Sequence, residues 1–246
     1  MKRAFPIVPI LTVLGAIGLV TTIWLIFTTT PTQFGYKSPA ADPRHFGLDG
    51  SSLFFNHKIF YYHVPHAFML FLAVFISGIC SVQFLRTRSP KWDDVALASC
   101  EVAVAFGAVV LVTGSIWAKA AWGFWWIWEQ RLVMSLLLWL TLVGYVLVRR
   151  FAGATGDRLA AGMSVFCMVG VPFIYVMVGA DDNHPQAGPD GNVAQLDPSM
   201  RGTFWLSVLT FFFWFLALVA MRVRAARMER EVRELRERGL DAGLFA

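Results

Sequence analysis

Long apolar runs separated by short polar or charged stretches dominate this chain of 246 residues. Six of the runs approach or exceed the length of about 20 residues that a helix needs to cross the hydrocarbon core of a bilayer. We expect the spans at residues 6–28, 59–83, 95–117, 132–149, 159–179 and 203–223. The predicted fold class is therefore all-α, a polytopic membrane protein with six transmembrane helices.

The segment after the sixth run has a different pattern, because Arg and Glu dominate it. Apolar residues recur there at alternating spacings of four and three, at Met221, Ala225, Met228, Val232 and Leu235. This spacing predicts an amphipathic helix that continues the sixth span and lies on lipid, on its own protein or on a cytoplasmic partner. We expect a six-helix transmembrane domain over residues 1–223 and a cytoplasmic amphipathic helical tail over residues 224–246.

Two further segments need an interpretation. The first run follows Met1, Lys2 and Arg3, which is also how a signal peptide begins. It is longer than a typical signal-peptide core, and no small-x-small cleavage site follows Phe27, so we expect it to be retained as a span. Residues 183–202 are rich in Pro, Gly and Asp, and this composition predicts an exposed outer loop.

Composition supports the membrane assignment and excludes several classes of protein. Apolar residues make up 57% of the chain and charged residues 15%, whereas soluble domains are about a quarter charged. A disordered protein, a disulfide-stapled secreted domain and a nucleic-acid module of the usual kind do not fit this balance. Cys80, Cys100 and Cys167 lie inside apolar runs, and the lack of a C-x-x-C pair argues against thiol exchange or c-type haem attachment to this chain.

The net charge of +5 follows from an uneven distribution of basic residues between the two sides of the membrane. Fifteen of the 21 lysines and arginines fall on one side: Lys2, Arg3, Arg86, Arg88, Lys91, Arg149, Arg150, Arg158 and the seven arginines of residues 222–238. Cytoplasmic loops carry the excess of positive residues, so this side, with both termini, is predicted to be cytoplasmic. The basic excess then reports topology and attraction to membrane lipid rather than nucleic-acid binding.

All five histidines fall on the outer half of this topology, at His45, His57, His63, His66 and His184. His63 and His66 lie at the outer end of the second span, where ionisable residues usually face protein or a water-filled site. The neutral-pH metal ligands of the chain are thus predicted to share one membrane face.

The densest chemical signal is WAKAAWGFWWIWEQRL, residues 117–132, which contains five of the ten tryptophans. Tryptophan commonly anchors helices at the membrane interface, but one or two rings at a helix end serve that purpose. If the stretch is helical, one side of the helix presents Trp122, Trp125, Trp126 and Glu129. Such a flat apolar surface suits a large planar ligand.

The topology places His63, the tryptophan stretch and His184 on the same outer surface. A histidine on each flank of an aromatic surface is the arrangement needed to hold haem iron from both faces. Lys119 and Arg131 could then pair with the propionates. Glu101, in the middle of the third span, needs a partner or a proton, and the sequence identifies neither.

The stretch WGFWWIWEQRL resembles the tryptophan-rich, WWD-type signature of the haem-handling membrane proteins of cytochrome c biogenesis, and within that group it is most similar to the CcmC family. The family pattern W-G-x-W-W-x-W-D, followed by R-L, falls on Trp122, Gly123, Trp125, Trp126, Trp128, Glu129 in place of Asp, Arg131 and Leu132. The family's H-V-P element falls on His63, Val64 and Pro65, and its H-Q-G-like element on His184 and Gln186, with Pro185 intervening.

The resemblance implies a non-enzymatic carrier in the bacterial inner membrane that binds haem b (iron protoporphyrin IX) at its periplasmic face. His63 and His184 would be the axial ligands, with His66 an extra candidate beside His63. The implied partners are a CcmE-type periplasmic haem chaperone, a CcmD-type small membrane protein, and the ABC transporter subunits CcmA and CcmB. The ATPase must be another chain, because no Walker A sequence G-x-x-x-x-G-K-[ST] occurs here.

The residues alone leave two other classes of function open. A membrane b-type cytochrome also holds haem between two histidines, but its ligands generally lie within spans, and only the second predicted span contains histidine. In a permease subunit, the tryptophans would only anchor helices.

Overall fold

The structure, a computed structural model, describes residues 7–30, 54–177, 193, 196 and 198–243. Within these residues it contains six helices and no strand: α1 (Ile7–Thr28), α2 (Phe54–Thr87), α3 (Pro90–Trp122), α4 (Gln130–Phe151), α5 (Gly153–Met177) and α6 (Pro198–Asp241). Each helix includes a stretch that is long and apolar enough to cross a membrane. The predicted all-α fold with six spans is confirmed.

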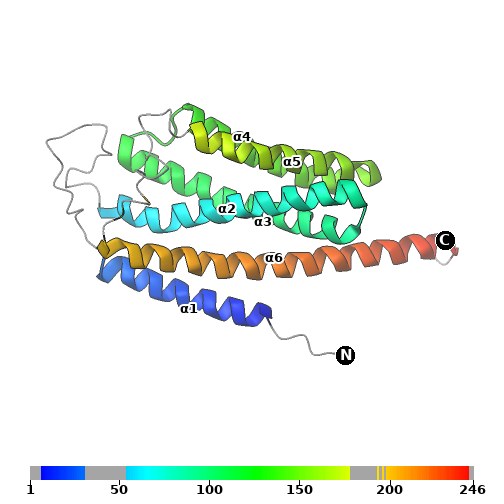
Figure 1. The fold of residues 1–246 in the computed structure, drawn as a ribbon, viewed down its shortest axis with the longest axis horizontal. Coiled ribbons are helices and arrows are strands. Elements are labelled where there is room, and N and C mark those ends of the chain that lie inside the picture. Colours follow the sequence, from blue (N-terminus) through cyan, green and yellow to red (C-terminus); the bar gives the residue numbers. More distant parts are fainter. Residues whose placement is uncertain (1–6, 31–53, 178–192, 194–195, 197, 244–246) are drawn as a thin grey trace.

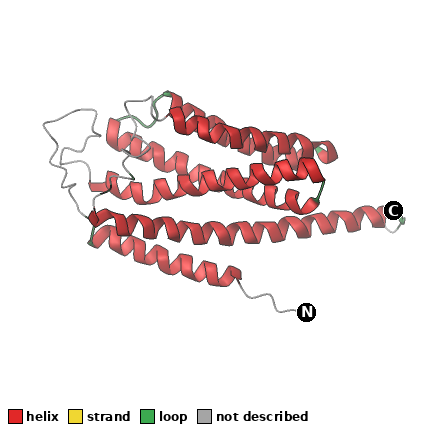
Figure 2. Ribbon diagram, in the orientation of Figure 1, coloured by secondary structure: helices red, strands yellow, loops and turns green. Residues whose placement is uncertain are grey.

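The helices pack as three antiparallel pairs (Figures 1 and 2). The α2–α3 pair lies in the middle, with α1 and α6 on one side and α4 and α5 on the other. Helix α3 contacts both α4 and α6, while α2 contacts both α5 and α6. The central pair therefore packs against both flanking pairs.

The bundle has two chemically different ends. At the end that we call the aromatic end, α1, α3 and α5 finish and α2, α4 and α6 begin (Figure 1). The opposite end, which we call the arginine end, carries the α2–α3 and α4–α5 turns, the start of α1 and the end of α6. All the basic side chains predicted to be cytoplasmic that the structure describes come from these arginine-end segments. Which end faces the cytoplasm stays a prediction.

Close contacts between small residues hold the helices together. On α2, the Ser77 hydroxyl donates to the carbonyl of Ala96 on α3 at 2.9 Å and lies 2.8 Å from the hydroxyl of Ser164 on α5. The next residue, Gly78, lies so close to Met168 that an added Cβ would come within 2.5 Å of that side chain. Small residues let membrane helices approach closely, so this layer fixes the spacing of α2, α3 and α5.

Helix α6 continues without interruption from Pro198 to Asp241 and extends past its neighbours at the arginine end (Figure 1). Its 44 residues correspond to a length of about 66 Å. The tail predicted from the spacing of Met228, Val232 and Leu235 is thus a continuation of the sixth helix. The division into a domain over residues 1–223 and a tail over residues 224–246 stays a prediction.

Candidate functional site

The tryptophan-rich segment is not a continuous helix. Helix α3 ends at Trp122, residues 123–129 are irregular, and α4 begins at Gln130. Gly123 has a φ of 81°, in the left-handed region, and its N–H donates to the carbonyl of Lys119 at 3.1 Å. A glycine in this conformation commonly ends a helix, because other residues adopt it at a cost. The stretch is therefore not helical throughout, and the prediction that one side of a helix presents Trp122, Trp125, Trp126 and Glu129 is wrong.

The irregular segment nevertheless exposes indole rings. The side chains of Trp125 and Trp128 are 60% and 79% exposed, and Phe124 beside them is exposed as well. Trp126 is half-buried and meets Trp128 edge to face, with the ring centroids 6.0 Å apart. The Nε1 of Trp126 is shielded from solvent and has no hydrogen-bond partner among the described residues. These rings form an open aromatic surface rather than an enclosed pocket.

The two ends of this segment are fixed by polar groups. The Lys119 ammonium donates to the carbonyl of Gly123 at 2.7 Å, which satisfies a carbonyl beyond the end of α3. At the other end, Glu129 precedes the first residue of α4, and both of its carboxylate oxygens are shielded from solvent. The Nη1 of Arg131 is shielded too. Arg131, expected beside a propionate, is thus half-buried at the base of the segment.

His63 lies on α2 and contacts α3 just below the tryptophan-rich segment. Its Nδ1 is 2.9 Å from the hydroxyl oxygen of Thr113. That hydroxyl uses its single hydrogen toward backbone carbonyls, at 2.7 Å from the oxygen of Val109. The Thr113 oxygen must then accept from Nδ1–H, so the neutral imidazole keeps its lone pair on Nε2. This is the tautomer in which Nε2 can bind a metal.

Two neighbours on α3 help to hold the His63 ring in place. The Trp117 ring lies edge to face with the imidazole, with the centroids 5.6 Å apart. A Cβ added at Gly114 would come within 3.1 Å of the His63 Cε1, so glycine at this position leaves room for the ring. Trp117 lies five residues before the end of α3, or about 7.5 Å along the helix axis. His63 is therefore linked through Trp117 to the start of the tryptophan-rich segment.

His66, one turn along α2, has different surroundings. Its Nδ1–H donates to the carbonyl of Tyr62 at 2.7 Å. The ring packs against Phe211 of α6, with the centroids 4.1 Å apart, and against Phe106 of α3 at 5.3 Å. The structure thus places His66 among the aromatic rings of α3 and α6, whereas His63 contacts the tryptophan at the end of α3.

Two of the predicted site residues fall where the structure offers no test. His184 lies outside the described residues, and so does the side chain of Trp122. The structure brings together His63 and Trp117, five residues before the end of α3, but it does not test the pairing of His63 with His184. Among the described residues, no group of three or more His, Cys, Asp or Glu side chains is arranged to hold a metal ion.

Sequence reasoning missed two features that the structure supplies. Thr113 and Gly114, which orient and accommodate His63, carry no distinctive motif; the only signal is that Thr113 and Trp117 are four residues apart and so share a face of α3. Glu101, whose partner could not be identified from the sequence, accepts a hydrogen bond at 2.7 Å from Nε of Arg222 on α6.

Comparison with known proteins agrees with this arrangement. The family model described as CcmC, heme exporter protein C, matches residues 52–238, which is most of the chain. The chain belongs to the CcmC family. The matched range includes His63, the tryptophan-rich segment, His184 and nearly all of α6. Membership in this family establishes haem handling by a membrane protein of six helices, and thus a transport role.

Several relatives are similar to the chain over most of its length. Heme exporter protein C of Paracoccus denitrificans is 29% identical over 184 residues, which cover 72% of this chain and 76% of the relative. Heme exporter protein C of Escherichia coli is 30% identical over 176 residues, or 69% of each chain. A ccmC-like mitochondrial protein of cytochrome c biosynthesis from Marchantia polymorpha is 34% identical over 97 residues, but these cover only 39% of this chain and 42% of the relative.

Proposed function

We propose that this CcmC-family protein holds haem b at its aromatic end, on the periplasmic face of the bacterial inner membrane, and presents it to a CcmE-type periplasmic haem chaperone. The observation that carries the proposal is the position of His63. Its ring is fixed by Thr113 in the tautomer that leaves Nε2 available, and it lies beside Trp117 at the base of a segment with exposed indoles.

His63 would supply one axial ligand to the haem iron. A metal-binding histidine usually donates its other ring N–H to a fixed acceptor, which orients the ring and raises the basicity of the ligand nitrogen. The Thr113 hydroxyl is such an acceptor, and its own hydrogen is directed at backbone carbonyls of α3. His63 is therefore suited to one of the two axial positions that a porphyrin leaves on its iron.

His184 is the proposed second ligand, from the segment between α5 and α6. The two histidines belong to parts of the chain more than a hundred residues apart. A carrier must release its haem, and ligands on separate elements can be parted by a movement of one element. We therefore assign His184 the role of the ligand whose displacement opens the site.

The tryptophan-rich segment would provide the surface for the porphyrin. Exposed rings such as Trp125 and Trp128 offer a large apolar area that suits a planar ligand. This surface would be completed by Trp122, Gly123 and Trp126, with Glu129 and Arg131 at its base. Arg131 follows Glu129 by two residues and would pair with a propionate of the haem. An open surface leaves one edge of the haem accessible to the chaperone.

The proposal includes further partners. Release of the loaded chaperone would depend on ATP hydrolysis by the ABC transporter subunits CcmA and CcmB, with a CcmD-type small membrane protein beside them. This chain would contribute the haem site, because its sequence lacks a Walker A motif.

The arrangement of the described histidines favours this proposal over a b-type cytochrome. His63 and His66 are the histidines whose side chains are described, and both lie on α2, one turn apart. Two side chains one turn apart on the same helix cannot bind opposite faces of one haem iron, so these two do not form the pair of ligands within spans that a b-type cytochrome generally uses. A permease subunit with anchoring tryptophans would have no use for the oriented imidazole of His63.

The decisive experiment uses the full chain, purified in mild detergent and loaded with haem. We expect oxidised and reduced absorption spectra of a six-coordinate, low-spin haem. His63→Ala and His184→Ala should each weaken haem retention and shift the spectrum from this form. His66→Ala is the matched control, one turn away on α2, and should keep it. Unchanged spectra in both His63→Ala and His184→Ala would remove them as ligands.

A further inference from the structure

A charged groove lies at the arginine end, far from the tryptophan-rich segment. Its walls come from α3, α4 and α6, and its volume is about 490 Å³. We call it the arginine groove; its lining residues are Leu97, Glu101, Val146, Arg149, Arg150, Arg222, Glu229 and Arg233. Neither the haem site nor the proposed chaperone contact uses any of these side chains.

The charges in the arginine groove balance in number, but they are unevenly paired: two of its four arginines hold all four of the carboxylates that contact them. Arg149 pairs with Asp93 and with Asp157, each at 2.7 Å. Arg222 is likewise satisfied, since its Nε donates to Glu101 at 2.7 Å and its Nη1 lies 3.4 Å from Glu229.

Two arginines are left over. Arg150 on α4 and Arg233 on α6 are exposed at the groove and form no ion pair with any residue that the structure describes. A guanidinium group without an ion pair has N–H donors available to an anion, and the planar fork of arginine matches the oxygens of a phosphate group.

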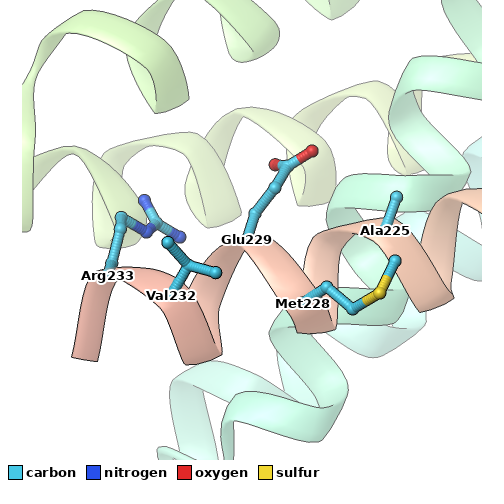
Figure 3. Close-up of a pocket in the computed structure, with 5 residues that line it drawn as sticks. All are labelled: Ala225, Met228, Glu229, Val232 and Arg233. Carbon is cyan, nitrogen blue, oxygen red and sulfur yellow. The ribbon is translucent and has the colours of Figure 1, made fainter. Parts of the chain in front are cut away.

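An open apolar face of α6 adjoins the charged groove. It consists of Ala225, Met228 and Val232, next to Glu229 and Arg233, which also border the arginine groove. Figure 3 shows Glu229, Val232 and Arg233 projecting from the same side of α6. Charged and apolar walls side by side suit a ligand that is itself anionic at one end and apolar at the other.

The depth of the groove in the membrane identifies the class of ligand. Arg150 is the second-last residue of α4, at the end of a helix that is long and apolar enough to cross a membrane. Val146, one turn earlier on α4, and Leu97 on α3 add apolar side chains to the lining of the groove. Basic pockets between membrane helices at the cytoplasmic surface are typical sites for the head groups of anionic lipids.

We propose that the arginine groove binds the phosphate head group of an anionic phospholipid through Arg150 and Arg233. The lipid would link the end of α4 to the tail of α6, two helices that both pack on α3. This site is independent of the proposed haem site, and its ligand is a membrane component rather than the transported haem.

The test measures phospholipid retention by the full chain in detergent, by native mass spectrometry during titration with phosphatidylglycerol or phosphatidylcholine. We expect retention of phosphatidylglycerol in preference to phosphatidylcholine. Each basic residue near a charged membrane surface contributes about fivefold to binding, so the double variant Arg150→Gln/Arg233→Gln should weaken retention by roughly thirtyfold. Arg150→Lys/Arg233→Lys keeps both charges but loses the planar forks, so its retention should lie between that of the glutamine variant and that of the wild type.

The matched control removes two exposed charges from the same end of the bundle outside the groove, in Arg158→Gln/Arg236→Gln. It should leave the preference for phosphatidylglycerol within about twofold of the wild-type value, since general attraction to the surface is weak in neutral detergent. Equal losses in both glutamine variants would overturn the proposal, because the charges would then act without a site.

Competition with inorganic phosphate distinguishes a lipid head group from a free phosphate ion as the ligand of the groove. We expect millimolar phosphate to leave phosphatidylglycerol bound, because the apolar face of α6 beside the groove contributes to retention of the lipid. Displacement of the lipid by phosphate at that concentration would contradict the proposal and assign the groove to a free anion. Haem spectra of the glutamine variant should match the wild type, so failure here is distinguishable from failure of the haem site.

Discussion

The two ends of the bundle use polar residues in opposite ways. At the arginine end, acidic and basic side chains from different helices pair closely, as in Arg149 with Asp93 and Arg230 with Asp94 at 2.9 Å. At the aromatic end, a neutral hydroxyl, that of Thr113, orients the imidazole of His63, and the nearby tryptophan-rich segment exposes its indoles. One end is connected across helices by charge, while the other presents an open surface.

This difference separates stability from function along the same helices. Helix α3 carries Asp93, Asp94 and Glu101 toward its start, and Thr113 and Trp117 toward its end. The first three hold α4 and α6 in place through arginines, and the last two position His63. Variants at the arginine end should therefore change the free energy of unfolding, and variants at the aromatic end should change haem binding.

The largest effect is expected from Arg149→Leu. The Arg149 side chain is only 6% exposed, and its loss leaves Asp93 and Asp157 without their shared partner. Breaking a buried ion pair from one side costs about 3–5 kcal/mol of folding stability. Unfolding in detergent, followed by circular dichroism, measures it. Arg158→Leu, an exposed arginine on α5, is the control and should stay within about 0.5 kcal/mol of wild type; equal destabilisation of the two variants would contradict the role of Arg149.

Thr113→Val should weaken haem binding by about tenfold to a hundredfold, the usual effect of removing a partner that orients a metal-binding histidine. The valine keeps the shape of the threonine but cannot accept the Nδ1–H of His63. Haem titration followed by absorption spectroscopy measures the change. Thr113→Ser retains the hydroxyl and should restore most of the affinity. If valine and serine bind haem equally, the Thr113 hydrogen bond has no part in the site.

The pair of Glu101 and Arg222 should show a coupling of about 1 kcal/mol in a double-mutant cycle of unfolding free energies, because both side chains are partly shielded from solvent. The variants are Glu101→Gln, Arg222→Gln and the combination. Arg227 and Glu231, an exposed pair on the tail of α6, should couple by only about 0.3–0.5 kcal/mol. A coupling at Glu101 no larger than this reference value would show that the pair does not fix α6 on α3.

An effect of similar size is expected from Trp125→Ala, because an aromatic contact contributes about 0.5–1.5 kcal/mol beyond the burial of its area. Haem affinity should fall about twofold to twelvefold for this single ring. Trp24→Ala on α1 is the control, since Trp24 is also 60% exposed but lies outside the tryptophan-rich segment. Equal losses of haem affinity in the two variants would indicate that exposed indoles act on the membrane rather than on haem.

The number of spans could be predicted from the sequence because a bilayer imposes a minimum length on each apolar run. The helix ends could not, since α2 begins at Phe54 and α3 at Pro90, both five residues before the expected spans. Polar residues such as Lys58 and Asp93 continue these helices beyond the apolar runs because they find partners in neighbouring helices. Hydrophobicity alone does not register such partners.

The candidate site shows the same division between local and long-range information. The end of α3 was readable in principle, because Gly123 stands inside the tryptophan cluster and glycine commonly ends a helix. The contact of His63 with Thr113 joins residues 50 positions apart, and that of Arg222 with Glu101 joins residues 121 positions apart. Such pairings depend on how three helices pack, which no spacing in the sequence reports.

The most direct test of the account is chemical rescue of His63→Gly. Removing the imidazole should leave a haem with one axial ligand missing, and added imidazole should restore the six-coordinate, low-spin spectrum by entering the vacated space beside Thr113 and Trp117. His66→Gly should keep that spectrum and show no response. If His63→Gly keeps the six-coordinate spectrum without imidazole, or if the loss and the rescue occur only in His66→Gly, His63 is not the ligand and the proposed haem site is wrong.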